Sequence, residues 1–529
     1  MQPDWLASAV FYQVYPQSFA DSNGDGIGDL PGLLGRLGHL EELGANALWL
    51  NPIFDSPFLD AGYDVRDHRR VAPRYGTEAD LRTLCDAAHA RGIRVLLDLV
   101  AGHTSWDHPG FLASARPEAN PWSDRFVWSD SPWTTRDGEL TYVSGTTDRM
   151  GAYAVNFFAH QPALNYGFAE PRRPWHQRPD APGPRANIER LKAIMAFWFA
   201  RGVDGFRVDL AASLVKHDPQ QTVVRALWRE LRAWLDAEFP GKVLVSEWAD
   251  PARAVSAGFH VDFMLHFGTP GYPELVFDGT GSGRIRSGVP HPWLDREGRG
   301  DFRRFLEPFL QQQEMIAGRG AVGLPSANHD FQRPRTGARG EDDLAVFHGF
   351  LLTWPGVPFV YYGDEIGLRY LPDLPSKEGG YERTGSRTPM QWEPGPGAGF
   401  SSADPAGFYL PLDPSPDRPD VASQRADPHA LWHHVRALVA ARRREPALRA
   451  DAPLELCTDG PGYPLAYLRG AGEARVFVAL QPAAAVAEVP LPAGATLAHT
   501  LAARRARVDG DRVRLDGPAV GVFRLAAEA

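Results

Sequence analysis

One short stretch, Gly205–Leu210 (GFRVDL), carries an arginine and an aspartate two positions apart in an otherwise apolar run. Successive side chains of a strand alternate between its faces, so Arg207 and Asp209 would point the same way. A guanidinium beside a carboxylate favours the ionised form that a nucleophile needs. The same spacing is also compatible with a purely structural ion pair. The other carboxyl groups of the chain help to decide between these two interpretations.

Two of these carboxyls follow apolar runs that read as strands. Glu247 comes after VLVS and precedes Trp248, and Asp330 closes the sequence SANHD, next to His329. A carboxyl beside an aromatic ring has surroundings that raise its pKa, as a general acid requires. Each residue could instead cap the helix that follows. Carboxyls in unlike environments, one paired with Arg207 and one beside tryptophan, are typical of glycosidic bond cleavage.

A weaker candidate is the stretch DLVAGHTS. His103 could donate a hydrogen bond to a ligand hydroxyl, and Asp98 could anchor the end of its strand. A lone histidine is more often a structural residue. A metal-dependent hydrolase fits poorly, because the sequence contains neither an H-x-H nor an H-E-x-x-H spacing.

These candidates need elements that bring strand ends together. Short apolar runs alternate with amphipathic stretches at 81–91, 188–200 and 223–238. This alternation predicts an α/β fold, the parallel (β/α)8 TIM barrel, whose active site lies at the C-terminal ends of its strands. The predicted strands are Val10–Tyr15, Ala47–Ile53, Arg94–Val100, Phe206–Leu210, Val243–Glu247, Val261–Phe267, Ala321–Ser326 and Phe359–Tyr362.

Two further domains are predicted around the barrel. Residues 104–185, after the third strand, are rich in Trp, Pro, Asp and Ser and too long for a loop, so we expect an inserted domain. The barrel would then comprise residues 1–103 and 186–448. Short alternating segments in 449–529 predict a C-terminal antiparallel β domain, a β-sandwich.

The stretch DSNGDGIGD has oxygen donors at alternate positions and glycines that permit sharp turns, which predicts a loop around a hard cation. It is not an EF-hand, because Gly32 stands where a bidentate glutamate is required. The donor number favours a structural Ca²⁺, with Mg²⁺ as the alternative; a solvated acidic turn is the other interpretation. The predicted ligands are Asp21, Asn23, Asp25, Ile27 and Asp29.

Composition limits the partners. The chain has 529 residues, 43% of them hydrophobic, with a formal net charge of −10, which argues against nucleic acid as a partner. Cys85 and Cys457 are far apart in sequence and predict reduced thiols. We see no signal peptide and no apolar run long enough to cross a membrane, so a cytoplasmic location is expected. The oligomeric state stays open.

Taken together, these stretches resemble glycoside hydrolase family 13, the α-amylase family, over essentially the whole chain. The opening FYQVYPQSFADSNGDGIGDLPGL resembles the oligo-1,6-glucosidase and α-glucosidase branch, including its calcium-binding loop. DLVAGHTS, GFRVDL, SEW and ANHD fall in the family's order and spacing. GYDVRDHRRVAPRYGT, QPALNY, GDEIGL and SRTPMQW are further matches.

The resemblance implies a role for each candidate. Asp209 would be the nucleophile, Glu247 the acid/base and Asp330 the stabiliser of the transition state. The reaction would be a double displacement that retains the α configuration, with the first two carboxyls ~5–5.5 Å apart. Residues implied to bind the terminal sugar are Arg207, His103 and His329 around it, Tyr63 stacked on its ring, and Asp60 and Arg387 closing the pocket.

At three positions the sequence departs from, or is ambiguous within, the family. Gly102 stands where the family usually has asparagine, which removes a polar contact near the sugar. Ala163 in QPALN replaces a carboxylate of the inserted domain. Leu210 follows the nucleophile at a position that varies with linkage preference.

The resemblance therefore predicts an exo-acting α-glucosidase that takes short oligosaccharides or α-glucosides. The alternative is a transglycosylase or isomerase of the same fold, like a trehalose synthase or a sucrose-acting enzyme. The RLDRD loop of sucrose isomerases is absent after Asp330, which counts against that form. A non-catalytic carbohydrate-binding barrel is a remote alternative, because binding alone does not need a nucleophile paired with an acid.

Overall fold

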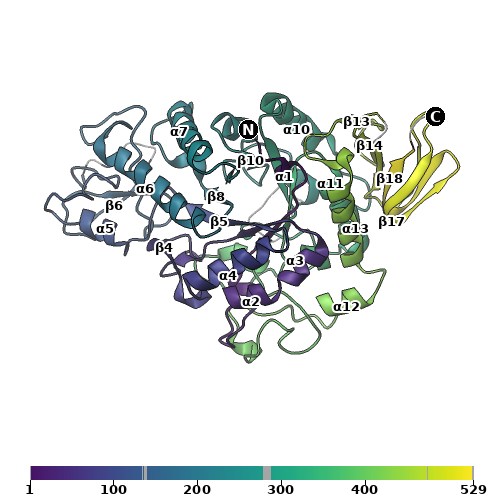
Figure 1. Ribbon diagram of the computed structural model, residues 1–529, viewed down its shortest axis with the longest axis horizontal. Coiled ribbons are helices and arrows are strands. Elements are labelled where there is room, and N and C mark those ends of the chain that lie inside the picture. The colour runs from purple at the N-terminus through teal and green to yellow at the C-terminus, as the bar shows by residue number, and fades with distance from the viewer. Residues whose placement is uncertain (1, 134, 136–139, 278–287, 473–474, 527–529) are drawn as a thin grey trace.

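The computed structural model describes residues 2–133, 135, 140–277, 288–472 and 475–526. Eight parallel strands form a closed barrel in the order β1-β12-β11-β10-β9-β8-β5-β2, as predicted (Figure 1). Most are slightly shorter at their C-terminal ends than predicted. The barrel strands are β1 (Phe11–Val14), β2 (Ala47–Leu50), β5 (Arg94–Val100), β8 (Gly205–Asp209), β9 (Val243–Ser246), β10 (Val261–Phe263), β11 (Ala321–Pro325) and β12 (Val357–Tyr361).

Helices cover the outside of the barrel, so its strands are buried on both faces and read as continuous apolar runs. Sequence signals set helix starts: Thr77 and Asp80 form a capping box before α4. The helices between and after the barrel strands are α2 (Leu30–Gly35), α3 (Leu37–Leu43), α4 (Glu78–His89), α6 (Pro182–Phe199), α7 (Thr222–Glu238), α8 (Pro251–Ser256), α9 (Pro273–Val276), α10 (Arg303–Ile316), α11 (Glu341–Thr353), α12 (Val421–Ala426) and α13 (Leu431–Arg444); the short α1 (Asp4–Ala7) precedes β1.

Aromatic side chains fill the middle of the barrel. Phe11 of β1 stacks on Phe359 of β12 with ring centroids 4.2 Å apart, and Phe263 of β10 meets Phe359 edge-on at 4.7 Å. Trp49 of β2 packs against Phe263 at 5.8 Å, and its indole N–H donates to Asp98 at 3.3 Å. The apolar core thus leads directly into the polar groups at the C-terminal ends of the strands.

The chain between β5 and α6 forms the predicted insertion, at the far left of Figure 1. It contains α5 (Pro109–Ser114) and the antiparallel pair β6 (Thr141–Val143) and β7 (Tyr153–Val155). A second small antiparallel pair, β3 (Phe54–Asp55) and β4 (Asp67–Val71), follows β2. Ala163 is fully buried in an apolar cluster with Val127, Ala154 and Phe168. This surrounding explains why an alanine fits at that position.

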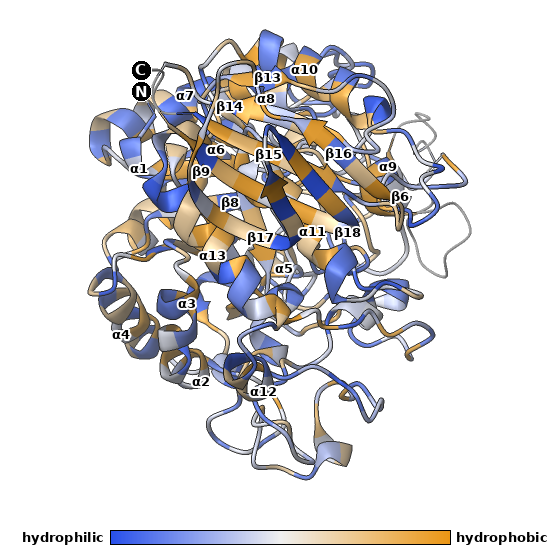
Figure 2. Cartoon of the chain, turned by 90° about the vertical axis from the view of Figure 1, so that its right-hand side faces the viewer, coloured by the Kyte–Doolittle hydropathy of each residue, from blue (hydrophilic) through white to orange (hydrophobic). Residues whose placement is uncertain are grey.

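The C-terminal region is one antiparallel sheet (Figure 2). β18 pairs with β16 through residues 512–516 and with β15 through residues 519–524, so a single strand joins both parts. All six strands are thus hydrogen-bonded into one sheet, with an apolar core of their own that includes Phe477, Val513 and Phe523. α11 packs on it where a Cβ at Gly349 would lie 2.6 Å from Val520. The strands are β13 (Leu454–Leu456), β14 (Leu465–Arg469), β15 (Val476–Gln481), β16 (Val486–Pro490), β17 (Leu497–Asp509) and β18 (Arg512–Leu525).

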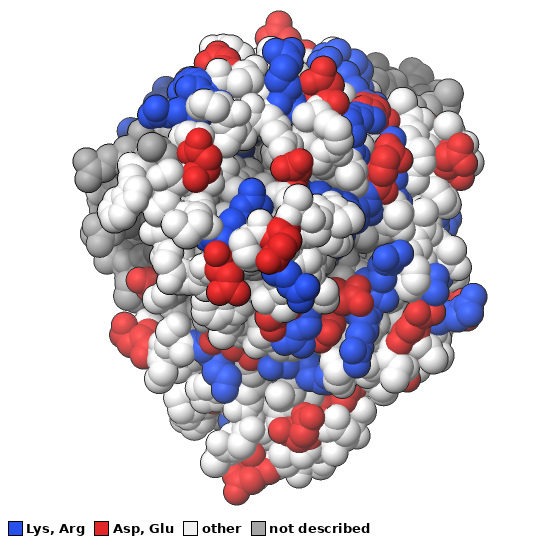
Figure 3. Space-filling view, turned by 90° about the vertical axis from the view of Figure 1, so that its left-hand side faces the viewer, with Lys and Arg blue, Asp and Glu red and all other residues white. Residues whose placement is uncertain are grey.

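The surface carries charged side chains of both signs (Figure 3). On the face at the end of the inserted segment, acidic and basic side chains are interspersed (Figure 3). In the part of the chain that the structure describes, no helix is long and apolar enough to cross a membrane. Cys85 is buried, Cys457 is exposed, and both are free thiols.

The aromatic centre of the barrel predicts a large effect of truncation. Phe359→Ala removes a fully packed ring and should destabilise the protein by ~3–5 kcal/mol, because the rings around it cannot collapse into the cavity. Thermal unfolding followed by circular dichroism measures this. Leu112→Ala, at a side chain with 52% exposure, is the control and should leave the melting temperature nearly unchanged. Equal melting temperatures for the two variants would contradict this packing.

Candidate active site

Three carboxyls meet at the mouth of the barrel because each follows a different strand. Asp209 is the last residue of β8, Glu247 directly follows β9, and Asp330 lies beyond β11. All three line one cavity of about 370 Å³. The other lining residues are Asp60, Tyr63, His103, Phe157, Gln161, Leu210, His266, Phe267 and Arg383.

Arg207 is the cation at the centre of this site. Its Nη1 lies 2.9 Å from Oδ1 of Asp209 and 2.9 Å from Oδ1 of Asp98, and its Nη2 lies 2.8 Å from Oε1 of Glu247. Its side chain is only 3% exposed and lies over the ring of Trp49 at 5.3 Å. Residues of β5, β8 and β9 are therefore joined through one guanidinium, and the nucleophile and acid candidates are held side by side.

Burial dominates the charge state of these carboxyls. It raises the pKa of Asp98 to about 6 and the pKa values of Asp209 and Glu247 to about 7, against the attraction of Arg207. We predicted from the sequence that Arg207 would keep Asp209 ionised. The structure adds that one guanidinium is shared among three buried carboxyls, so burial opposes the ionisation of Asp209 more strongly than a single ion pair would indicate.

The backbone directly after β8 orients Glu247, the acid candidate. Leu210 adopts a left-handed conformation, with φ at 42°, and its N–H donates to Oε2 of Glu247 at 3.1 Å. A non-glycine residue in this region of φ is strained, and such strain is common at functional sites. Trp248 was expected to raise the pKa of Glu247. Burial is the largest cause of the raised pKa of Glu247, and the indole N–H of Trp248 donates to Gln221 at 3.0 Å.

Asp330 has the opposite electrostatic setting. Burial opposes its ionisation, but His329, Arg383 and Arg387 against its carboxylate outweigh burial and hold the pKa of Asp330 well below its usual range. Arg383 lies 2.9 Å and Arg387 3.2 Å from its Oδ1. Asp330 therefore stays negative, whereas burial raises the pKa values of Asp209 and Glu247.

His329 and Tyr63 form a wall behind the carboxyls. Burial lowers the pKa of His329 well below its usual range, so the ring is neutral. Its Nδ1 accepts from Asn51 at 3.0 Å, so its Nε2–H faces the hydroxyl of Tyr63 at 2.7 Å. That hydroxyl donates to Asp98 at 2.9 Å. Tyr63 lines the cavity, whereas His329, 1% exposed, supports it from behind.

Asp60, Gln161 and Arg383 form a polar cluster in the lining of the cavity. Gln161 donates to Oδ2 of Asp60 at 2.8 Å, and Arg383 lies 3.3 Å from Oδ1 of Asp60. Arg387 was expected at this place. It is not among the lining residues and instead supports Asp330 from behind, with Nε donating to the carbonyl of His329 at 2.7 Å.

Five lining residues were not named from the sequence. Gln161 belongs to QPALNY and Arg383 precedes SRTPMQW by a few positions, so both lie in or beside stretches that had been recognised. Phe157, His266 and Phe267 lie in loops, where spacing gives no signal of the direction of a side chain. The rings of Phe157 and Phe267 are 49% and 41% exposed.

The predicted cation loop folds around its own backbone. Both oxygens of Asp21 accept backbone N–H groups, including that of Gly26 at 2.8 Å, and Oδ1 of Asp29 caps α2 through Gly32 at 2.6 Å. Among the residues with described positions, no three His, Cys, Asp or Glu side chains form a metal-binding group. The hard oxygen donors of the loop fit Ca²⁺ or Mg²⁺ chemically, with backbone or water oxygens completing the set. The cation stays a prediction.

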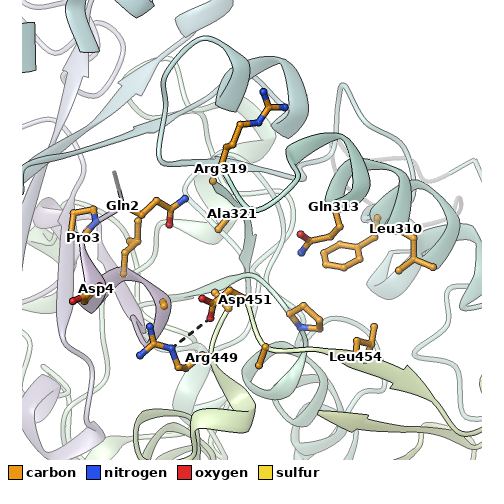
Figure 4. Close-up of a pocket in the computed structure, with 18 of the residues that line it drawn as sticks. Gln2, Pro3, Asp4, Leu310, Gln313, Arg319, Ala321, Arg449, Asp451 and Leu454 are labelled. Carbon is orange, nitrogen blue, oxygen red and sulfur yellow. Dashed lines mark ion pairs between the residues drawn. The ribbon is translucent and has the colours of Figure 1, made fainter. Parts of the chain in front are cut away.

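A larger cavity, of about 770 Å³, lies elsewhere, next to the start of β11 (Figure 4). Gln2, Gln313 and Arg319 line it, with an ion pair of 3.5 Å between Arg449 and Asp451. It is at the N-terminal ends of the strands and has no convergent carboxylates. The smaller cavity at the opposite end is therefore the candidate active site.

Comparisons with known proteins agree with this geometry. The family model described as "Alpha amylase, catalytic domain" matches residues 13–230 and 301–451. The chain is 32% identical over 517 residues to "Trehalose synthase/amylase TreS" of Mycobacterium tuberculosis, covering 88% of this chain and 80% of that protein. It is also 32% identical over 552 residues to a "Probable alpha-glucosidase" of Rhizobium meliloti, covering 92% and 91%.

Among solved structures, the "alpha-glucosyl transfer enzyme, XgtA" matches with a TM-score of 0.79 at 27% identity, covering 99% of this chain and 100% of that chain. The printed names of these similar proteins include both a glucosidase and a transfer enzyme. The likeness extends over barrel, inserted segment and C-terminal sheet.

The raised pKa of Glu247 predicts a pH-dependent effect on stability. Its pKa is about 7 in the folded protein and about 4.3 in an unfolded chain. The stability that it contributes is therefore complete below about pH 4 and lost as the pH rises through about 7. The glutamine in Glu247→Gln does not ionise. The melting temperature of this variant, relative to that of the wild type, should therefore be higher at about pH 8 than at about pH 5.

Glu230→Gln is the matched control for this measurement. Its hydrogen bond from Arg185 lowers the pKa of Glu230 to about 2, so this carboxyl is ionised throughout that pH range. The difference between Glu230→Gln and the wild type should therefore be the same at both pH values. A constant difference for Glu247→Gln as well would show that Glu247 does not titrate in this window.

Proposed function

Because the chain belongs to the alpha-amylase family of enzymes, we propose that it is a retaining, exo-acting α-glucosidase. In this proposal it releases a terminal α-linked glucose from short oligosaccharides or α-glucosides. The observation that carries the proposal is the contact of one buried guanidinium with both Asp209, at 2.9 Å, and Glu247, at 2.8 Å. Paired carboxyls sharing one proton are suited to a nucleophile and a general acid.

The reaction would proceed in two displacements. An oxygen of Asp209 attacks the anomeric carbon while Glu247 gives its proton to the leaving glycosidic oxygen, which breaks the bond to the leaving sugar. Glu247, now ionised, then takes a proton from water as that water attacks the same carbon and releases Asp209. Attack from opposite faces in turn retains the α configuration. The carboxyl separation of ~5–5.5 Å expected for this course stays a prediction.

Asp330 supplies a fixed charge in this scheme. Positive charge develops on the sugar ring in the transition state, which resembles an oxocarbenium ion. Asp330 is held ionised by Arg383 and Arg387, so it faces that charge without itself exchanging a proton. A pre-oriented charge of this kind stabilises the transition state more than the ground state.

The polar cluster in the cavity supports an exo mode of action. Asp60, Gln161 and Arg383 are joined there by a hydrogen bond and an ion pair. Carboxylate, amide and guanidinium groups suit the hydroxyls of a terminal sugar, which in this proposal is the unit that they bind. Leu210, Phe157 and Phe267 contribute apolar surface to the same cavity, on which the leaving part of the substrate would lie.

The second candidate function is transfer of the same glucosyl group to another sugar, as in a trehalose synthase or a sucrose-acting isomerase. The names of similar proteins favour it, since they include "Trehalose synthase/amylase" and an "alpha-glucosyl transfer enzyme". Both reactions share the first displacement and differ in whether water or a retained sugar attacks the glucosyl-enzyme. The exposed rings of Phe157 and Phe267 would hold such a sugar by stacking.

We also propose a structural cation, Ca²⁺ or Mg²⁺, in the loop of Asp21, Asn23, Asp25, Ile27 and Asp29. The alternate oxygen donors of this loop and its tight turns support it. Asp29 also caps α2, so the loop connects β1 to the first helix of the barrel. The cation would stabilise this connection and take no part in catalysis.

Product analysis decides between hydrolysis and transfer. Maltose, isomaltose, nigerose, kojibiose, trehalose and sucrose are each incubated with the wild type and with Asp209→Ala. We expect free glucose from one or two of them and a loss of at least ~1,000-fold in the variant, because no other group can form the glucosyl-enzyme. New disaccharides without matching free glucose would instead establish the transferase. No turnover of any substrate would reject both functions.

Removal of divalent cations tests the loop. EDTA should lower the melting temperature of the wild type, and added Ca²⁺ should restore it, because binding to the folded state alone stabilises that state. Asp25→Asn should respond less to EDTA, since it has lost one charged ligand. Asp404→Asn, at an exposed capping residue outside the loop, should behave like the wild type. If neither EDTA nor Ca²⁺ changes the melting temperature of the wild type, the loop is an ordinary acidic turn without a bound cation.

A further inference from the structure

The space beside Gly102 is filled by a residue of the inserted segment. A Cβ at position 102 would lie 2.5 Å from Nδ2 of Asn156 and 3.6 Å from Oγ of Ser213. Both of these neighbouring atoms belong to side chains and not to the backbone. Asn156 therefore occupies the place where a larger residue at 102 would begin its side chain. The polar group that Gly102 lacks is supplied here from another part of the chain.

Lys216 determines how the amide of Asn156 is oriented. Its Nζ donates to Oδ1 of Asn156 at 2.8 Å and to the carbonyl of Ser213 at 2.8 Å. An ammonium group only donates, so the oxygen of the amide must face Lys216. The NH₂ group then faces Nδ1 of His103, at 3.4 Å. Lys216 is 6% exposed, which holds it in this arrangement.

The amide in turn determines the tautomer of His103. An NH₂ group can only donate to Nδ1, so the ring proton lies on Nε2, which donates to the carbonyl of Tyr63 at 3.0 Å. Burial lowers the pKa of His103 to about 4, so the ring is neutral. His103 lines the cavity of the carboxyls. Both ring nitrogens are therefore engaged within the protein, and Asn156 and the carbonyl of Tyr63 fix the orientation of the ring.

We propose that Asn156 and Lys216 are positioning residues that hold His103 against the sugar, in place of the polar side chain absent at Gly102. This inference rests on the proposed function in one respect, that the cavity accepts a glucosyl unit. The contacts of Asn156 with His103 and Lys216 join the inserted segment to the loops that follow β5 and β8.

The same loop also reaches the polar cluster of Asp60, Gln161 and Arg383. The backbone N–H of Asn156 donates to the carbonyl of Gln161 at 3.3 Å, and the side chain of Gln161 holds Asp60. Phe157, the next residue, lines the cavity. A shift of Asn156 would therefore disturb His103 first and the polar cluster second. Displacements of this size near a reacting centre are costly, up to ~100-fold in rate for ~1 Å.

A residue swap tests the proposal. Asn156→Ala removes the amide, and the double variant Gly102→Asn/Asn156→Ala returns an amide from the neighbouring position into the space thereby opened. We expect Asn156→Ala to lower kcat/KM about tenfold and to weaken glucose binding, measured by calorimetry, to a similar degree. The double variant should recover most of both losses. A residue with only a structural role would not be rescued in this way.

Lys216→Met provides a second route to the same result. It should reproduce the loss in Asn156→Ala, because the amide is then free to rotate its oxygen towards Nδ1 of His103. Lys242→Met, which removes a lysine paired with Asp204 away from the cavity, is the matched control and should keep wild-type kinetics. Melting temperatures of all variants show whether each is folded.

Crystal structures of the wild type, Asn156→Ala and the double variant give a readout independent of activity. The ring of His103 should shift or rotate in Asn156→Ala and return in the double variant. An unmoved ring, or kcat/KM within about twofold of the wild type in Asn156→Ala, would overturn the proposal. If the wild type turns over no α-glucoside, the proposed function fails, and the position of the ring still decides whether Asn156 positions His103.

Discussion

The active site depends on burying one guanidinium with three carboxyls. Arg207 satisfies Asp98, Asp209 and Glu247 with the two terminal nitrogens of its side chain. Buried charges are tolerated only when they are paired and hydrogen-bonded. The closed barrel meets this requirement because β5, β8 and β9 are consecutive in it, so their C-terminal ends deliver all four groups to one point. Trp49 and Tyr63 keep water away from the guanidinium.

Because one cation serves three carboxyls, these carboxyls and Asp330 have different pKa values. The cluster near Arg207 lacks the positive charge to ionise fully, so a proton stays on it near neutral pH. Asp330 faces Arg383 and Arg387, which come from a loop after β12, and it remains charged. Two carboxyls with raised pKa values, Asp209 and Glu247, and one carboxylate that stays charged, Asp330, thus line the same cavity. The setting of Asp330 does not come from the strands alone, since Arg383 and Arg387 belong to a loop after β12.

This dependence explains what could be predicted from the sequence. The barrel strands and the residues at their ends could be found, because apolar runs and alternation report directly on strands. Arg383 was missed, and the place of Arg387 behind the cavity lining could not be foreseen, because the chain between them turns in a way that no periodicity reveals. The setting of Asp209 was only partly predictable for a related reason: sequence neighbours indicated one partner for Arg207, whereas the fold supplies three.

The choice between water and a sugar as acceptor belongs to the loops as well. In both proposed reactions the carboxyl cluster would form the same glucosyl-enzyme, so it would not discriminate between the two. Discrimination would depend on how long the leaving sugar stays and how well water is excluded, and Phe157, Leu210 and Phe267 are the apolar residues of the cavity that could affect both. Phe157 directly follows Asn156 in the inserted segment. If Asn156 positions His103 as proposed, one loop would affect both the geometry of the bound sugar and the fate of the glucosyl group.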